Sequence, residues 1–164
     1  MRFAILTISD RSYHGEREDL SGPALIDVLQ KQGWKVIDIG LVPDEPDLIA
    51  QKLIEWADGG KCDVILTTGG TGFAPRDVTP EATLEVIDRQ APGLAEAMRS
   101  ESLKVTSHAM LSRAVCGIRK QTLIINLPGS PKAAEENLAV IIPVLPHAVQ
   151  LLRNDPASES GHKI

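Results

Sequence analysis

Apolar residues along the chain gather in short runs that alternate with segments of helical spacing. The runs that predict strands cover residues 3–9, 34–42, 62–67, 114–118 and 122–127. Helical spacing predicts helices over residues 24–29, 48–56 and 94–103, from 79 onward, and from 131 to about 152. Continuous apolar runs are typical of strands buried on both faces, and strands that alternate with helices form a mostly parallel sheet. The pattern predicts an α/β fold with three layers, α/β/α, around a mostly parallel central sheet.

Residues that begin and end helices mark the same elements. Thr79-Pro80 and Ser130-Pro131 each place a capping residue before a proline at the first helical position, and Gly33 suits a helix end. Residues 153–164 are polar and lack periodicity, which predicts a disordered tail. Because no repeat or linker interrupts the rest, residues 1–152 are predicted to form one domain.

Composition limits the kind of partner and the compartment. Of the 164 residues 43% are hydrophobic and only 3% aromatic, so one core of mostly aliphatic side chains is expected. The net charge of -5 argues against nucleic acid or an anionic membrane as the main partner, and no apolar stretch approaches the ~20 residues that span a bilayer. Cys62 and Cys116 lie in apolar runs, which indicates buried free thiols in a reducing compartment. With no cleavage site after the first apolar run, we expect a cytoplasmic protein.

Polar residues with chemical potential follow four of the predicted strands. Ser9-Asp10-Arg11 comes after the first, Asp44 after the second, residues 68–77 after the third, and Pro128-Gly129-Ser130 after the last. In open α/β sheets ligands bind outside the carboxyl ends of the strands. The four loops are therefore predicted to converge on one edge of the sheet and to form a binding site there.

The third loop contains the run Thr68-Gly69-Gly70-Thr71-Gly72. Its glycines let the backbone approach a ligand and direct N–H groups at an anion, and its threonines add hydroxyl donors, so a phosphate is the expected guest. No Gly-Lys-Ser/Thr follows, which excludes a P-loop. A tight turn without a ligand explains the same glycines.

Asp77 and Asp44 are the candidate metal ligands. If both face the site, their carboxylates suit a Mg²⁺ ion that also binds substrate phosphates. Each also fits a simple role at the start of a helix. Arg76 either neutralises phosphate charge or pairs with a surface carboxylate.

The turn Pro128-Gly129-Ser130, followed by Lys132, is a second candidate anion site, because it ends a strand and begins a helix. A capped helix with an exposed lysine is the alternative. Ser112-Arg113 either donates to a ligand or lies in a subunit interface, and the histidines show no ligand spacing. Two anion sites at one edge indicate a ligand with two anionic parts.

Four of these motifs together resemble the MogA/MoaB family of molybdenum-cofactor biosynthesis. The resemblance extends from Phe3 to about Leu152 and is specific because the motifs are long and ordered. In chain order they are Ile8-Ser9-Asp10-Arg11, Thr67-Thr68-Gly69-Gly70-Thr71-Gly72, Arg76-Asp77-Val78-Thr79-Pro80-Glu81-Ala82-Thr83 and Asn126-Leu127-Pro128-Gly129-Ser130-Pro131-Lys132. Arg-Asp-Val-Thr-Pro is typical of the MogA branch.

The resemblance implies the molybdopterin-binding, MogA-like fold and a molybdopterin adenylyltransferase, which makes adenylyl-molybdopterin and pyrophosphate from ATP and molybdopterin with Mg²⁺. By resemblance Asp77 and Asp44 serve Mg²⁺ binding and catalysis, and Ser112 contributes to pterin binding. A homotrimer and a separate molybdenum-insertion protein that receives the product are also implied. The alternative within the family is a MoaB-like or scaffold protein that binds molybdopterin without efficient adenylylation.

Overall fold

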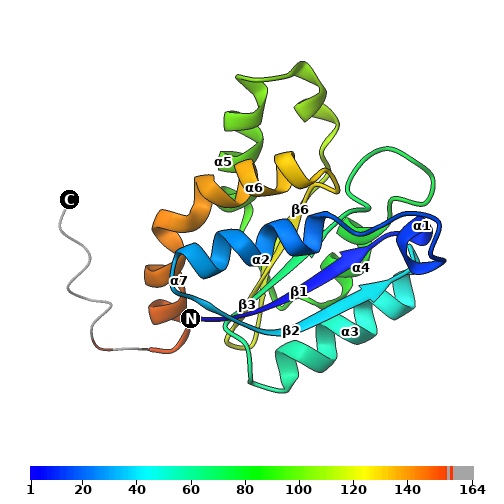
Figure 1. The fold of residues 1–164 in the computed structure, drawn as a ribbon. Helices are drawn as coiled ribbons and strands as arrows, with labels where there is room; N and C mark the ends of the chain where they lie inside the picture. Colours follow the sequence, from blue (N-terminus) through cyan, green and yellow to red (C-terminus); the bar gives the residue numbers. More distant parts are fainter. Residues whose placement is uncertain (155, 157–164) are drawn as a thin grey trace.

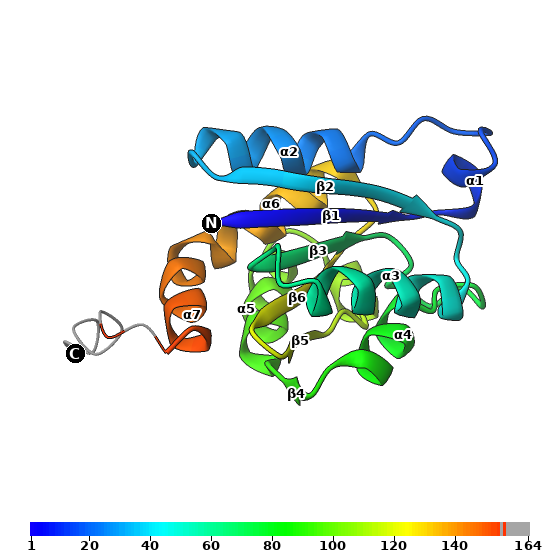
Figure 2. The same ribbon diagram turned by 90° about the horizontal axis from the view of Figure 1, so that it is seen from below.

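The computed structural model describes residues 1–154 and 156 and contains a six-stranded sheet. Across the sheet the order is β2 (Lys35–Val42), β1 (Arg2–Ile8), β3 (Val64–Thr68), β6 (Thr122–Leu127), β5 (Cys116–Arg119) and β4 (Arg89–Gln90). The first four strands are parallel, and β5 is antiparallel to both of its neighbours. Figure 2 shows the six strands following one another in this order. The predicted mostly parallel sheet is confirmed.

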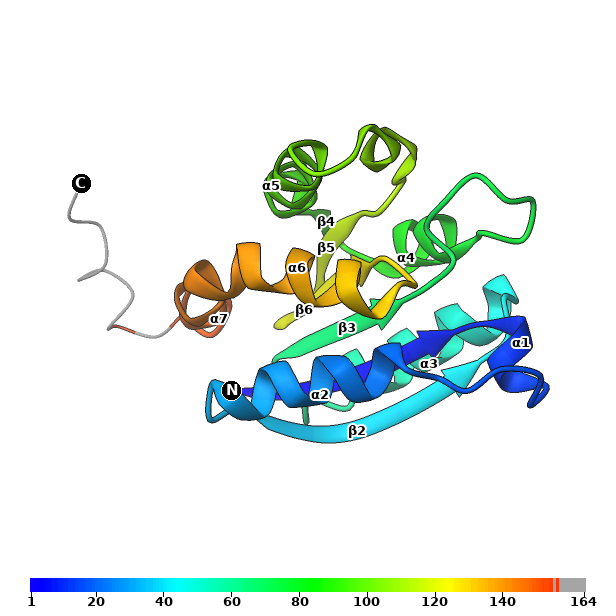
Figure 3. The same cartoon turned by 45° about the horizontal axis from the view of Figure 1, so that its top comes forward.

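Helices cover both faces of this sheet, which confirms the three layers. α2, α5, α6 and α7 pack on one face, and α3 and α4 pack on the other. In Figures 1 and 3 α2 and α6 lie across the near face. Their bounds are α1 (Asp10–Tyr13), α2 (Ser21–Lys31), α3 (Pro46–Asp58), α4 (Thr79–Val86), α5 (Pro92–Leu103), α6 (Pro131–Ile141) and α7 (Leu145–Leu152). None of the helices described is long and apolar enough to cross a bilayer.

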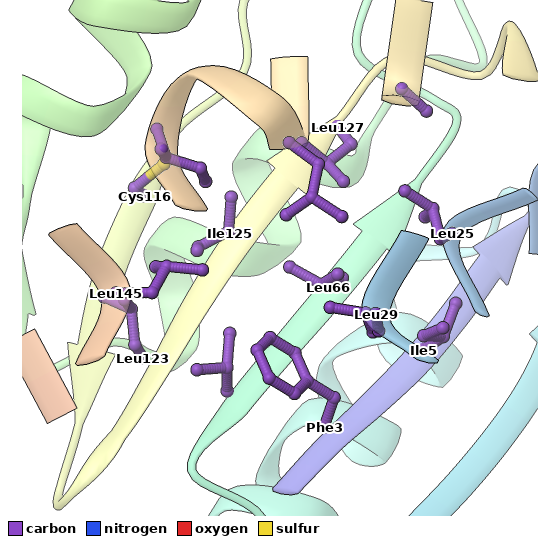
Figure 4. Packing of buried hydrophobic residues seen from close by; sticks show 14 of the residues in the cluster. Phe3, Ile5, Leu25, Leu29, Leu66, Cys116, Leu123, Ile125, Leu127 and Leu145 are labelled. Carbon is purple, nitrogen blue, oxygen red and sulfur yellow. The ribbon is translucent and has the colours of Figure 1, made fainter. Parts of the chain in front are cut away.

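Two apolar cores hold the layers together, one on each face. Along β1 successive side chains alternate between the faces, so Phe3 and Ile5 pack with Leu29 of α2, and Leu6 packs with Leu53 of α3. Figure 4 shows Phe3, Ile5 and Leu29 meeting over the sheet. All five are 0% exposed, and full burial of such a side chain contributes about 1.5–3 kcal/mol. The central strands are thus fixed from both sides.

Both cysteines are buried and free, as the sequence predicts. Burial raises the pKa of the Cys62 thiol to about 11 and that of Cys116 to about 12. At neutral pH both therefore stay protonated and behave as small apolar side chains.

The single helix predicted from residue 131 to about 152 is wrong. The chain forms α6, a 3-10 turn η2 (Ile142–Val144) and then α7. Pro143 causes the break, because it lacks an N–H and its ring would clash with the carbonyl four residues earlier in a continuous helix. The sequence pattern also misses α1 and β4, whose 4 and 2 residues are too short to display a period.

An ion cluster lies at the amino ends of the strands. The carboxylate of Asp63 accepts a hydrogen bond from the backbone N–H of Arg2 at 2.8 Å and another from its guanidinium at 2.8 Å. The guanidinium of Arg153 contacts the same carboxylate. Arg153 and Asn154 begin the segment predicted to be a tail, and residues 155 and 157–164 of that segment lie outside the residues described.

Candidate active site at the carboxyl ends of the strands

Four loops meet at the carboxyl end of the sheet, as the strand order requires. β2, β1, β3 and β6 are parallel neighbours, so the segments that follow them lie side by side, at the end marked by α1 in Figure 1. They enclose a cleft of about 450 Å³. The predicted site residues that line it are Ser9, Asp10, Asp44, Thr68, Gly69, Gly70, Asp77, Gly129 and Ser130.

The first glycines of the third loop let the four loops touch. Gly69 and Gly70 have φ angles of 104° and 62°, in the region that favours glycine. A Cβ at Gly69 would lie 2.2 Å from the carbonyl oxygen of Ile8, and one at Gly70 would lie 2.4 Å from Oγ1 of Thr79 and 3.0 Å from Oδ1 of Asp44. The tight-turn explanation of these glycines therefore holds. It explains how Asp44 comes to lie against this loop.

Part of the same loop remains free to bind an anion. The N–H of Gly69 donates to the carbonyl of Leu127 at 3.2 Å. Among the hydrogen bonds of the described chain, none uses the N–H of Gly70, Thr71 or Gly72. Three consecutive unused donors on a glycine-rich turn suit a phosphate.

The hydroxyl donor expected at Thr68 is not available to a ligand. The side chain is fully buried and donates to the carbonyl of Pro128 at 2.7 Å. Thr79 does not cap α4 as predicted either, since its hydroxyl donates to the carbonyl of Gly69 at 2.9 Å and Val78 occupies the capping position. Both hydroxyls stabilise the loop, because a buried hydroxyl needs a partner within the protein.

Asp44 and Asp10 hold their two loops together through reciprocal hydrogen bonds. The N–H of Asp10 donates to Oδ2 of Asp44 at 2.8 Å, and the N–H of Asp44 donates to Oδ1 of Asp10 at 3.0 Å. Glu45, rather than Asp44, occupies the capping position of α3. Burial raises the pKa of the Asp44 carboxyl above its ordinary value, and the charges of Asp10 and Asp77 add to that rise. Asp44 is thus a carboxylate held in the cleft beside two others.

Asp77 presents a second carboxylate to this cleft. Its Oδ2 accepts the N–H of Ala74 at 2.8 Å, and its own N–H donates to the carbonyl of Ala74 at 2.9 Å. In the hydrogen bonds described, Oδ1 of Asp77 and Oδ1 of Asp44 have no donor. Two carboxylates with a free oxygen each can hold a divalent cation, and the described residues contain no group of three or more His, Cys, Asp or Glu that could hold a metal. A ligand would have to supply the remaining oxygens.

Arg76 pairs with carboxylates of the protein. Its Nε lies 2.6 Å from Oδ2 of Asp10 and its Nη2 lies 2.7 Å from Oε1 of Glu45. The hydrogen bond from Arg76 lowers the pKa of Asp10 below its ordinary value. Of the two roles that the sequence leaves open for Arg76, the structure favours pairing with carboxylates at the rim of the cleft.

A second pocket of about 290 Å³ lies beside the first, between α5, α6 and the 3-10 helix η1 (Ser107–Leu111). Four predicted site residues line it, and they are Thr71, Gly72, Ser112 and Pro128. The two cavities therefore share the glycine-rich loop and the turn after β6. Lys132 lines neither cavity. Its amine is exposed and lies 3.8 Å from Oε1 of Glu136. The exposed-lysine alternative holds for it.

Sequence reasoning misses several residues of these walls, among them Asp19 and Arg99. Asp19 lines the cleft, where it accepts the hydroxyl of Thr7 at 2.6 Å and the N–H of Ser21 at 3.0 Å. Arg99 of α5 lines the second pocket. Asp19 could have been found from the sequence, because an Asp three residues before Gly22 is a turn signal. Nothing in the helical spacing of α5 marks Arg99.

Comparison with known proteins gives one consistent match. The family model described as "Probable molybdopterin binding domain" matches residues 4–147. The molybdenum cofactor synthesis protein cinnamon of Drosophila melanogaster is 49% identical over 93% of this chain, which spans only 26% of that relative. A molybdopterin adenylyltransferase of Helicobacter pylori (strain J99) is 45% identical over 93% of this chain and 88% of its own length. The crystal structure of MoaB from Thermus thermophilus, named a molybdopterin biosynthesis enzyme, is 53% identical with a TM-score of 0.89, covering 94% of this chain and 98% of its own.

Proposed function

This chain belongs to the family of probable molybdopterin-binding domains, and on that premise we propose that it is a molybdopterin adenylyltransferase of molybdenum-cofactor biosynthesis. It transfers AMP from ATP to molybdopterin and releases pyrophosphate. The observation that carries the proposal is the pair of carboxylates, Asp44 and Asp77, that face one cleft beside a glycine-rich loop with unused N–H groups. The similarity to a relative of that name over most of its length supports it.

The cleft is proposed to hold the triphosphate of ATP. The free N–H of Gly70, which lines the cleft, binds a phosphate oxygen, and the free N–H groups of Thr71 and Gly72, which line the second pocket, are available where the two cavities meet. Asp44 and Asp77 hold Mg²⁺ through their free oxygens, which fits an ion that is usually bound by one or two carboxylates plus substrate phosphates. When bound, Mg²⁺ neutralises phosphate charge and orients the reacting groups. Its charge also offsets the repulsion among Asp10, Asp44 and Asp77.

The second pocket is proposed to take molybdopterin. Ser112 lines it, and its Oγ accepts the N–H of Ala114 at 3.4 Å, which leaves the hydroxyl hydrogen free to donate. Arg99 and His108 bring further donors to the same walls. Because the two cavities share one loop, the two substrates would meet at that loop.

The reaction requires positioning more than a covalent nucleophile. A phosphate oxygen of molybdopterin attacks the α-phosphorus of ATP, the bond to the β-phosphate oxygen breaks, and pyrophosphate leaves. Fixed geometry and charge neutralisation supply most of the acceleration in such transfers. The chain contributes to positioning and to charge neutralisation through the backbone donors of residues 70–72, a segment that Thr79 and Arg113 hold in place.

A second candidate is a protein that binds molybdopterin without efficient adenylylation. The observation that favours it is the 53% identity to a structure that bears the name MoaB, the branch to which the family resemblance assigns this role. Arg76-Asp77-Val78-Thr79-Pro80, typical of the MogA branch by resemblance, favours the transferase.

Substitution of the two carboxylates tests the proposal. We expect Asp77→Ala and Asp44→Ala each to lower Mg²⁺-dependent AMP transfer by at least ~100-fold, since each removes charge that positions the phosphates. The measurement is the mass of adenylylated pterin formed from molybdopterin, ATP and Mg²⁺.

The matched control is Asp47→Ala, which removes an exposed carboxylate in the first turn of α3, away from the cleft. Wild-type rates in either cleft variant would reject the roles of the carboxylates. A wild-type chain that binds molybdopterin but makes no product would favour the second candidate.

The remaining expectations rest on the family resemblance. They are a homotrimer, a cytoplasmic location and the transfer of the product to a separate molybdenum-insertion protein. Each stays a prediction.

A further inference from the structure

Arg113 contacts both ends of the loop that carries Asp77. Its backbone N–H donates to the carbonyl of Thr71 at 2.9 Å, and its Nε donates to the carbonyl of Gly72 at 2.7 Å. Its Nη2 donates to the carbonyl of Asp77, and its Nη1 pairs with Glu81 in the first turn of α4. One side chain thus joins the start and the end of residues 72–77.

The loop between these two ends is exposed. Phe73 at its tip is 67% exposed, and residues 73–76 pack on neither core. The bonds between Ala74 and Asp77 close the loop on itself without attaching it to the sheet. Contacts from Arg76 and Arg113 to other loops therefore restrict where the Asp77 carboxylate can lie.

A second arginine holds Arg113 in place. Arg99 donates from Nε to the carbonyl of Ser112 at 3.0 Å and from Nη2 to the carbonyl of Ala114 at 3.0 Å. These are the residues on either side of Arg113. Since Arg99 and Ser112 also line the second pocket, a continuous series of contacts runs from that pocket to Asp77 in the cleft.

We propose that Arg113 is a positioning residue that holds the backbone at Asp77 and thereby fixes the place of the Asp77 carboxylate in the cleft. The inference rests on the proposed function. Arg113 does not line the cleft, so it acts through Asp77 rather than on the phosphates. Only a planar guanidinium can reach Gly72, Asp77 and Glu81 together, because its donors form a rigid fork that an ammonium lacks.

Arg113→Ala tests the proposal by its kinetic pattern. We expect kcat for AMP transfer to fall about 100-fold, with KM for molybdopterin changed less than threefold, because a displacement near 1 Å of a positioned group has an effect of that size. The Mg²⁺ concentration needed for half-maximal rate rises in parallel. Guanidinium chloride at roughly 20 mM restores part of kcat by filling the vacated space, whereas urea at the same concentration does not. Arg113→Lys stays impaired.

Hydrogen exchange gives a readout that does not depend on turnover. Amides of residues 72–77 exchange faster in Arg113→Ala, and amides of α2 exchange as in the wild type. If the wild-type chain makes no product, the proposed function fails while the exchange result still decides whether Arg113 fixes the loop. Any one of three results would overturn the positioning role. The first is an unchanged kcat, and the second is unchanged exchange over residues 72–77. The third is an activity loss that accompanies faster exchange in α2 and that guanidinium does not rescue.

Discussion

Asp44 is the residue at which the proposed function and the stability of the fold oppose each other. Burial, together with the charges of Asp10 and Asp77, raises the pKa of its carboxyl above 3.8. A raised pKa in the folded state means that the ionised carboxylate destabilises the fold. This cost is complete above the raised pKa and disappears as the pH falls below 3.8, where the carboxyl is protonated in the unfolded chain as well.

We therefore expect Asp44→Asn to raise the melting temperature at pH 7 while it abolishes AMP transfer. The amide oxygen still accepts the N–H of Asp10, and the charge is gone. Because much of Asp44 is in contact with solvent, the gain is reduced to roughly 2–4 °C, which corresponds to ~1 kcal/mol in a domain of this size. Calorimetry from pH 7 to pH 4 measures it. A gain that stays constant down to pH 4 would contradict the explanation.

At the scale of single residues, position in the sequence predicts some contacts and not others. Asp44 follows β2 closely and Asp77 lies in the loop after β3, so the topology brings both to the carboxyl end of the sheet, where they line the cleft. Thr68 is also in the right place, yet its hydroxyl is used by Pro128, a residue 60 positions away. The direction in which the Arg113 side chain extends depends on three contacts, to Gly72, Asp77 and Glu81, and none of them is local. Side-chain hydrogen bonds between distant segments are what the sequence alone does not specify.

At the scale of elements, a buried amide joins β6, β3, α4 and the residue that precedes β5. Nδ2 of Asn126 donates to Oγ1 of Thr67 at 3.0 Å and to Oγ1 of Thr83 at 2.9 Å, and its Oδ1 accepts the N–H of Val115 at 3.2 Å. Asn126, Thr67 and Thr83 are all 0% exposed. The amide is fully satisfied, and it positions the ends of the elements from which the cleft loops begin.

Asn126→Ala should lower the free energy of unfolding by about 2–4 kcal/mol, because it removes three buried hydrogen bonds and leaves Oγ1 of Thr67 and the N–H of Val115 without their donor and acceptor. Asn137→Ala is the control. That amide also makes two hydrogen bonds, but it lies beside the second pocket and is 7% exposed, so water can replace it. Chemical denaturation of both variants tests the difference. Equal losses of unfolding free energy in the two variants would show that burial of the hydrogen-bonded amide in the core does not cause the destabilisation.

The elements themselves are predicted well where the apolar period is long. The strands β1 and β3 are recognised because they are buried on both faces. β2 is predicted in the same way but lies at the edge of the sheet, with Ile37 and Ile39 exposed by 42% and 56%. Hydrophobicity alone does not distinguish an edge strand from a central one. The order of strands in the sheet is set by long-range pairing, which local pattern does not contain.

At the scale of the whole molecule, the two ends of the sheet carry different groups of interacting residues. The cleft occupies the carboxyl ends of the strands, and Asp63 joins Arg2 and Arg153 at the amino ends. Burial raises the pKa of the Asp63 carboxyl, but hydrogen bonds from Arg2 and the charge of Arg153 lower it more, so the net pKa is below 3.8. This stabilisation is present above pH 3.8 and is lost as the pH falls through the lowered pKa.

Asp63→Asn should therefore destabilise the domain by about 1–3 kcal/mol at pH 7 without changing the rate of AMP transfer, since the hydrogen bonds from Arg2 lose their charged acceptor. The difference from the wild type shrinks as the pH falls below 3.8. Glu55→Gln, which breaks an exposed pair with Lys52 within α3, is the control and should change little. Thermal melts with activity measured on the same samples check both. A loss of kcat in folded Asp63→Asn would contradict the separation of the two ends.

The loop shared by the two cavities has a further consequence for the proposed reaction. Each substrate occupies one cavity, whereas adenylyl-molybdopterin would occupy both at once. A ligand held at two linked points rebinds at one end before the other leaves, so its release is much slower than that of either half. Pyrophosphate is held at one point only and departs first. The protein would thus retain its product until another protein removes it.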